Sequence, residues 1–366
     1  MKIRRFIALP FLLLLGSGSA LAQSSVYSEC SSHYSMVYLG SITMDYFRQH
    51  HPECFSGNGG VVGQDVIRGT TLWQNFAITN VVNNRFPDAG APEQFVSRGV
   101  TGLSAGASPS KWSTWANYNG NNQRYTAYGP RTSRSESETG NLVVGADYLI
   151  TPRFVLGASL AIDESEARSY PNATQVALGI TLPLNIETHG YSIAPYLGWQ
   201  ITPEWTLDAS AGWGKGRYLD NISYAKSDRR FAAINLSYTR WFGNWQALGK
   251  ASYFHATEKY GDTTVNTVGV IAGSGYRNKL SQFRLGGQVG YWANGTMPYA
   301  GLAYTNDVSR SAQANTPWDR SALVMTLGVD FTSVKNGVTA GFAYNREMGR
   351  SDSRNYNFIG SLNIRF

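Results

Sequence analysis

Residues 102–106, GLSAG, match the G-x-S-x-G pattern that presents a serine nucleophile on a sharp turn, which makes Ser104 the first candidate for covalent chemistry. That chemistry needs a strand before the serine, a helix after it, and a histidine and an orienting residue that converge on the hydroxyl. Residues 88–110 are instead rich in Gly, Ser, Ala and Pro, which is typical of a flexible linker. The strand histidines, His189 and His255, have no such companions near them in the sequence. We therefore predict that the protein is not an enzyme and binds no cofactor.

The first 22 residues predict export. Three basic residues within positions 2–5 precede an apolar run at 6–15, and the sequence ALA at 20–22 forms an A-x-A cleavage site. The apolar run is too short for a membrane-spanning helix, which argues against an uncleaved anchor. Residues 1–22 are predicted to be a secretory signal peptide.

Two cysteines, Cys30 and Cys54, are the only ones in the chain, and both lie near the predicted mature N-terminus. In an exported protein the simplest expectation is one disulfide that closes a small loop within residues 23–60. Zinc is disfavoured because a two-cysteine site is incomplete, although three histidines lie nearby in the sequence. We predict no metal site.

The composition favours a β-barrel over a soluble globular domain. Charged residues make up 15% of the chain, which also contains 39 Gly, 10 Trp, 22 Tyr and 16 Phe. Soluble domains usually carry about a quarter charged residues, whereas glycine and aromatic girdles suit a membrane barrel. Loss of the signal peptide removes three positive charges and lowers the net charge from +7 to +4, with the basic residues scattered. No nucleic-acid partner is predicted.

From residue 111 onward, apolar and polar residues alternate with the period of β-strands. The alternation predicts twelve strands, at 111–120, 142–150, 154–163, 190–201, 205–216, 230–242, 245–254, 282–293, 297–307, 321–332, 338–348 and 355–366. The connections are predicted to be short after every even-numbered strand up to the tenth and long after every odd-numbered one. Bacterial outer-membrane barrels sort their connections in this way, with short periplasmic turns and long surface loops.

The segment at 174–186, TQVALGITLPLNI, is itself strand-like and would raise the count to thirteen. Because single-chain bacterial barrels have an even number of strands, we interpret it as a surface hairpin or as an extension of the next strand.

Charged residues fall on one face of the predicted strands. The face assigned to the lumen carries Asp147, Asp163, Asp208, Lys250, Arg284, Asp330, Glu347 and Arg365. The opposite face carries almost no charge except Arg240, which lies near a short turn. A basic side chain at the middle of a bilayer costs about 2–4 kcal/mol, so this distribution predicts that the outer face meets lipid. Residues 111–366 are therefore predicted to form an all-β, twelve-stranded antiparallel transmembrane β-barrel in the outer membrane of a Gram-negative bacterium.

The region before the barrel differs in pattern. Residues 64–86 are predicted to form a helix in which apolar residues are interspersed with Asn and Gln, and Pro87 ends it. We divide the region into a short N-terminal segment (23–60), a linker helix (61–90) and a flexible linker (91–110).

These features together resemble the C-terminal translocator domain of the bacterial autotransporter (type V secretion) family. The resemblance rests on the helix at 64–86, the GLSAG linker, a first strand that opens with Trp112, the hairpin at 145–161, the strand at 297–307 and the terminal Phe366. It covers roughly residues 61–366.

The resemblance implies a twelve-stranded barrel with the helix inside its lumen. It also implies that the barrel assembly machinery recognises the last strand, and periplasmic chaperones are expected as further partners. The residues that would carry this assembly signal are Phe358, Leu362, Ile364 and Phe366. In the absence of such a signal, the same residues would simply contact outer-membrane lipid.

Asn83 and Asn84 resemble the intra-barrel Asn-Asn cleavage site of serine protease autotransporters, where an asparagine attacks its own backbone with help from lumen acids. Nothing else in this stretch matches that site. The chain departs from most of the family in its passenger, because residues 23–60 are too few for a stacked β-helix.

The predicted function is therefore that of an outer-membrane barrel that anchors and displays a short N-terminal segment and surface loops, in adhesion to a host or surface ligand. The N-terminal segment is expected either in the periplasm or at the cell surface. The alternative is a pore for small solutes, and an enzyme is the least supported class.

Overall fold

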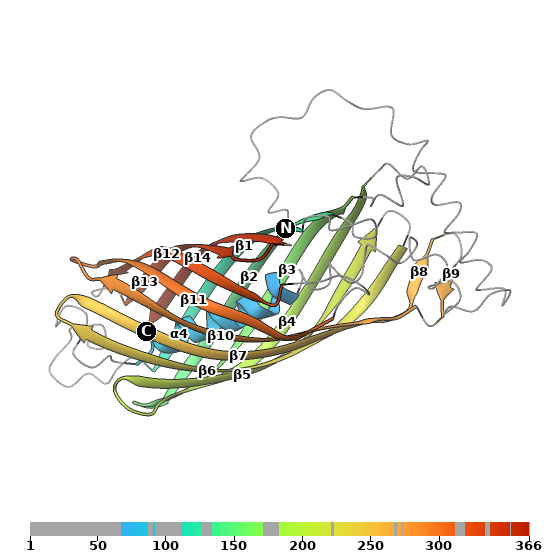
Figure 1. The fold of residues 1–366 in the computed structure, drawn as a ribbon. Helices are drawn as coiled ribbons and strands as arrows, with labels where there is room; N and C mark the ends of the chain where they lie inside the picture. The colour runs from blue at the N-terminus through green and yellow to red at the C-terminus, as the bar shows by residue number, and fades with distance from the viewer. Residues whose placement is uncertain are drawn as a thin grey trace, which may run out of the picture.

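The structure is a computed structural model that describes residues 67–86, 91, 111–125, 134–170, 183–220, 223–266, 269–272, 274–311, 319–333, 337–351 and 353–365. Twelve long antiparallel strands close into a barrel around helix α4 (Thr71–Asn83), as Figure 1 shows. The predicted fold class, an all-β barrel of twelve strands with a helix in its lumen, is confirmed. Among the described residues, no helix is long and apolar enough to cross a membrane.

The barrel strands follow one another around the wall in chain order. They are β1 (Trp112–Tyr125), β2 (Ser135–Thr151), β3 (Phe154–Ser169), β4 (Leu184–Gln200), β5 (Trp205–Asp220), β6 (Ser223–Phe242), β7 (Trp245–Tyr260), β10 (Arg277–Tyr291), β11 (Thr296–Arg310), β12 (Ser321–Ser333), β13 (Val338–Met348) and β14 (Ser353–Arg365). β10 pairs with β7, and β14 pairs with β1, from Ser113 opposite Arg365 to Tyr125 opposite Ser353. This last pairing closes the barrel and leaves neither terminal strand with a free edge.

The strands alternate between the lumen and the outside. In β14, Phe358, Leu362 and Ile364 are exposed on the outer face, whereas Asn357 and Asn363 are buried on the inner face. The outer face of the whole barrel is apolar and aromatic near the short turns, with tilted pairs such as Trp112 with Tyr148, Trp205 with Tyr238 and Trp245 with Tyr291. Such a face suits contact with lipid and its interfacial region.

The strands are longer than predicted at the end of the barrel away from the short turns. β5 ends at Asp220 and β6 begins at Ser223, and β13 ends at Met348 and β14 begins at Ser353. The expectation of long connections at these two places is therefore wrong. The extended parts carry charged outer faces, such as Lys226 in β6, because strands that project beyond the lipid need no apolar surface.

Two short strands lie in the connection between β7 and β10. β8 (Thr263–Val265) pairs with β9 (Gly269–Ile271) and with the start of β6, and in Figure 1 the pair lies at one end of the barrel. The sequence did not predict them. Of the strand-like segment at 174–186, residues 184–186 open β4, while 174–182 lie outside the described residues.

Glycines on the inner face make room for aromatic rings from neighbouring strands. A Cβ at Gly145 would overlap the Trp115 indole, and a Cβ at Gly157 would overlap the Tyr196 phenol. Both rings therefore pack closely against the wall, in the same core cluster as the helix. The turn from β10 to β11 has Asn294 and Gly295 at φ values of 49° and 92°, the left-handed pair that tight hairpins favour.

Candidate functional site

Helix α4 is enclosed by the barrel, and residues on every side of it are buried. The run from Thr71 to Asn83 contains no Gly or Pro, and a break at Thr70 separates it from one helical turn at 67–69. A helix enclosed on all sides must find a partner for each polar side chain, because burial of an unpaired polar group is costly. The partners of α4 come from the inner face of the barrel wall.

A cluster of charged residues holds the segment just before α4. Arg68 donates to Asp307 of β11 and lies 3.7 Å from Glu347 of β13. Arg350 lies 3.1 Å from Asp307 and also pairs with Glu347, while Arg310 lies 3.3 Å from Asp307. The carboxylate of Asp307 is fully buried, so it serves as the centre of the cluster.

The first turns of α4 are fixed by hydrogen bonds to β3 and β4. Gln74 is completely buried, and its amide nitrogen donates to the Ser159 hydroxyl at 3.1 Å. The Ser192 hydroxyl donates to the carbonyl oxygen of the same amide at 2.5 Å. Both hydrogen-bonding sides of Gln74 are thereby used.

The middle of α4 meets a buried carboxylate. The Thr79 hydroxyl donates to Asp208 of β5 at 3.0 Å, and Asn235 of β6 donates to the same oxygen at 2.7 Å. Asn235 also donates to Asn75 at 3.1 Å, and Ser210 donates to Asn75 at 3.3 Å. These bonds set the rotation of the helix against β5 and β6.

The end of the helical segment is held by a second ion pair. Arg85 Nε lies 2.6 Å from Asp147 of β2, and a second guanidinium nitrogen donates to the Lys111 carbonyl at 2.6 Å. The Tyr196 hydroxyl donates to Asp147 at 3.1 Å and accepts a bond from Trp115 Nε1 at 2.8 Å. Arg85 and Asp147 are both buried, which makes this pair sensitive to the loss of either partner.

The two ion pairs define the direction of the helical segment in the barrel. Arg68 pairs with Asp307, near the end of β11 at Arg310, and with residues beside the β13–β14 connection. Arg85 pairs with Asp147, near the turn at 152–153, and bonds Lys111 just before β1. The segment therefore enters at the end with the long connections and leaves at the end with the short turns.

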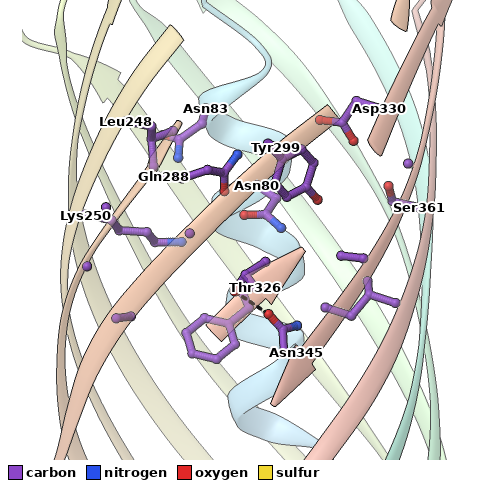
Figure 2. A pocket seen from close by; sticks show the side chains of 18 of the residues that line it. Asn80, Asn83, Leu248, Lys250, Gln288, Tyr299, Thr326, Asp330, Asn345 and Ser361 are labelled. Atoms are coloured by element: carbon purple, nitrogen blue, oxygen red, sulfur yellow. Dashed lines mark hydrogen bonds between the residues drawn. The ribbon is translucent and has the colours of Figure 1, made fainter. Parts of the chain in front are cut away.

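The helix divides the lumen into two unequal parts. It packs against the inner faces of β1–β6, which we call the packed half, and it also contacts β7. The open half consists of the inner faces of β7 and β10–β14, and a cavity of about 200 Å³ lies between it and the helix. Figure 2 shows Asn80 and Asn83 of α4 beside this cavity, with Lys250, Gln288, Tyr299 and Asp330 around it.

Seven of the eight lumen residues predicted from the sequence take part in these features, Glu347 among them through Arg68 and Arg350, whereas Asp163 pairs with Arg229. Asp147 and Asp208 bond the helical segment, and Arg365 donates to the Asn84 carbonyl. Lys250, Arg284 and Asp330 line the cavity instead. The sequence reasoning missed Arg68, Arg85 and Asp307 as site residues, although the two arginines are the only basic residues between positions 64 and 86.

Asn83 and Asn84 lie at the end of α4 inside the barrel. Asn83 donates to the Ser237 hydroxyl at 3.0 Å, and Asn84 follows the helix in a helical conformation. Asp208, the carboxylate one turn away, is engaged by Thr79 and Asn235. Cleavage at this bond stays a prediction. Cys30, Cys54, Ser104 and Phe366 lie outside the described residues.

The two strand histidines do not reach the lumen site. His255 Nδ1 is 2.8 Å from the Ser281 hydroxyl on the neighbouring strand, and the side chain of His189 is half exposed, with both ring nitrogens 3.9 Å from glutamates. No group of three or more potential metal ligands occurs among the described residues.

Twelve strands, an apolar outer face and a polar lumen define an outer-membrane β-barrel, here with a helix inside. The chain matches the autotransporter β-domain family model over residues 114–345, which is more than half of its length. It belongs to that family. A search of curated proteins finds no match.

Solved autotransporter barrels share the fold at low sequence identity. The transport unit of AIDA-I from Escherichia coli is 10% identical, with a TM-score of 0.54 over 80% of this chain and 99% of that one. The β domain of Bordetella BrkA is 14% identical, with a TM-score of 0.52 over 70% and 100%. The translocator domain of NalP from Neisseria meningitidis is 12% identical, with a TM-score of 0.52 over 70% and 89%.

Proposed function

We propose that the barrel anchors the protein in the outer membrane and displays residues 23–60, with its long connections, at the cell surface. The observation that supports this is the direction of the helical segment. Arg68 is paired with Asp307 at the long-connection end, and Arg85 is paired with Asp147 at the short-turn end. In outer-membrane barrels the long connections face the outside of the cell and the short turns face the periplasm. We therefore infer that the chain enters the barrel at Ile67 from the cell surface, so that residues 23–60 are displayed there.

Protease treatment of intact cells tests the proposal. An epitope inserted after Ser25 should be lost when intact cells are treated with proteinase K, while the barrel fragment stays in the membrane. The matched control carries the same epitope between Gly243 and Asn244 in the short β6–β7 turn, and this epitope should be protected until the outer membrane is opened. Protection of the Ser25 epitope in intact cells, followed by digestion after permeabilisation, would contradict surface display.

Adhesion is the role that we propose for the displayed parts. The helix and the inner face of the barrel bind each other. The N-terminal segment and the long connections are therefore the parts that we propose to contact a host or surface ligand. Cells that express the full chain should bind host cells more than cells that express a variant lacking residues 23–60. Equal binding, with equal barrel levels in both strains, would remove adhesion by this segment.

We further propose that Cys30 and Cys54 form a disulfide within the displayed segment. Mass spectrometry of the chain alkylated without reduction should then show both cysteines unmodified, and reduction should make both react. The Asn83–Asn84 bond can be followed in the same spectra. Cleavage would yield a fragment that ends at Asn83 and disappears in Asn83→Ala.

The C-terminal residues are proposed to carry the assembly signal for the barrel assembly machinery. Phe358, Leu362 and Ile364 lie together on the outer face of β14, beside the β1 seam. Deletion of Phe366 should sharply reduce the amount of folded barrel in the membrane, measured by its heat-modifiable mobility on gels. Deletion of Asp262, an exposed residue after β7, is the control and should leave that amount almost unchanged.

A pore is the second candidate, and the cavity beside the helix favours it. A barrel filled evenly by its helix would leave no space of about 200 Å³ along one wall. In planar bilayers the full chain should conduct weakly, and deletion of residues 61–90 should raise the conductance strongly. Conductance that is unchanged by this deletion would contradict a lumen plugged by the helix.

A further inference from the structure

We propose that the cavity in the open half of the lumen binds a small organic anion, a carboxylate joined to an apolar body. The proposal does not depend on surface display. It rests on two basic residues, Lys250 of β7 and Arg284 of β10, which line this cavity. They lie on neighbouring paired strands, two residues apart in the register, because Lys250 is opposite Gly286 and Arg284 is opposite Ser252.

The two residues differ from the other cations that are buried in the lumen. Those others each pair with a carboxylate within hydrogen-bonding or ion-pairing distance, and they are Arg68, Arg85, Arg229, Arg310 and Arg350. Lys250 and Arg284 form no ion pair and no hydrogen bond with any described residue, and their contacts are with the Phe76 ring. The other buried cations of the lumen are thus paired with carboxylates, whereas Lys250 and Arg284 face the cavity.

The nearest acidic groups do not fill this role. Asp208 acts electrostatically on Lys250 but makes no ion pair with it: its Oδ1 accepts from Thr79 and Asn235, and its buried Oδ2 has no hydrogen-bond partner among the described residues. Glu347 acts in the same way on Arg284, but it is bound by Arg350. Each therefore attracts a cation from a distance and offers it no direct contact. Asp330 lies farther along the cavity, and its carboxylate rests over Gly341.

The walls of the cavity account for the apolar part of the ligand. The Phe76 ring centre lies 4.8 Å from the Arg284 guanidinium carbon and 5.6 Å from Lys250 Nζ. Trp73, Tyr299 and Leu248 add further apolar surface. One water molecule needs about 10–15 Å³ of such space, so a cavity of about 200 Å³ admits a small aromatic acid.

The chemistry of the two cations selects a carboxylate. A guanidinium presents two parallel N–H donors that match the two oxygens of a carboxylate, and an ammonium group adds a third donor from a second direction. With both positive groups beside one ring, an aromatic carboxylate can meet the charges with its head and the ring with its body. A neutral ligand of the same shape would gain only the contact with the Phe76 ring.

Binding of 4-fluorobenzoate tests the proposal. The full chain is purified from outer membranes into detergent, and the ¹⁹F signal of the ligand is followed as protein is added. We expect saturable binding of 4-fluorobenzoate, with 4-fluorobenzamide at least about tenfold weaker because it lacks the charge. Lys250→Gln and Arg284→Gln should each weaken 4-fluorobenzoate binding about tenfold, for the same reason. Lys226→Gln removes the same charge from an exposed outer position and should have no effect.

A second measurement uses the unaltered protein. Acetylation of Lys250 by acetic anhydride, read by mass spectrometry, should fall when 4-fluorobenzoate is present, while acetylation of Lys226 should not change. The proposal is overturned if 4-fluorobenzoate and 4-fluorobenzamide bind alike, if 4-fluorobenzoate binds the lumen variants as tightly as it binds Lys226→Gln, or if it leaves the acetylation of Lys250 unchanged.

Discussion

The two halves of the lumen treat the helix differently. In the packed half, Gln74, Asn75 and Thr79 are completely buried and bond β3–β6 directly, and Val82 sits over a glycine of β4. In the open half a cavity separates α4 from the wall along its middle, and the wall holds on to the segment at its ends, through Asp307 and Arg365.

This difference suggests a division of labour in one barrel. The packed half sets the position and rotation of the helix, since its contacts are short, numerous and specific in shape. The open half closes the barrel and supplies the ends of the segment with charge, but leaves space in between. A lumen of this kind can hold a helix firmly and still keep a cavity beside it.

The largest effect is expected where the open half grips the segment. Replacement of Asp307 by Asn leaves Arg68, Arg310 and Arg350 around a neutral group, and loss of one partner in a buried ion pair costs about 3–5 kcal/mol. We expect a loss of this size in the free energy of unfolding, measured by guanidinium denaturation in detergent. Asp228→Asn, which removes an exposed charge from β6, is the control and should change it by less than about 0.5 kcal/mol. A similar loss in both variants would mean that the buried cluster is unimportant.

The packed half is probed by adding one carbon atom. A Cβ at Gly198 of β4 would overlap side chains of Val82 and Val155, so Gly198→Ala should destabilise the protein by about 1–3 kcal/mol and raise its conductance as the helix is displaced. Gly249 of β7 has no atom within 4 Å of an added Cβ. Gly249→Ala should therefore be neutral, or stabilising by up to about 1 kcal/mol, because glycine is unfavourable in strands. Gly249 faces outward, since the adjacent Lys250 faces the cavity, so it serves as the control, and equal effects of the two substitutions would mean that Val82 does not pack tightly over Gly198.

A smaller effect is expected at the long connection over the open half. The hydroxyl and backbone N–H of Ser351 each donate to Asp319 at 2.6 Å, and these bonds lower the pKa of its carboxyl group. Because the carboxyl group has a lower pKa in the folded state, its ionised form stabilises the protein at pH values above the ordinary pKa of about 3.9. This stabilisation is lost as the pH falls from that value through the lowered pKa. Because Asp319 is only partly buried, Asp319→Asn should cost less than about 1 kcal/mol at pH 7 and still less at pH 2. Thermal unfolding of the variant and the parent at both pH values measures this, and a constant difference would rule out the carboxylate as its source.

The barrel was predictable because lipid requires a simple pattern. Outward residues such as Leu156, Leu302 and Phe358 must be apolar and alternate with lumen residues, and that alternation identifies each strand. The alternation is lost where the strands project beyond the lipid, because outward residues there need not be apolar. Lys226, Asp228 and their neighbours have polar side chains on the outer face, so the extended ends of β5 and β6 resemble a loop in sequence.

The lumen was predictable only in part. Charged residues on inner faces could be listed from the register, and Asp147 and Asp208 were found in this way. Their partners could not be assigned, because a pair such as Arg68 and Asp307 joins positions that are 239 residues apart. The helix was expected over 64–86, but Thr70 is not helical and separates the turn at 67–69 from α4, which begins at Thr71. The unequal division of the lumen depends on side-chain volumes across the barrel, which no local pattern records.

The most direct test of the two-sided lumen compares one serine from each half. In a background where Cys30 and Cys54 are replaced by serine, Ser159→Cys places a thiol beneath Gln74, and Ser361→Cys places one at the cavity. A small methanethiosulfonate reagent should modify the cysteine at 361 rapidly and the cysteine at 159 very slowly. Deletion of residues 61–90 should make the two rates similar. Equal rates with the helix in place would contradict the account.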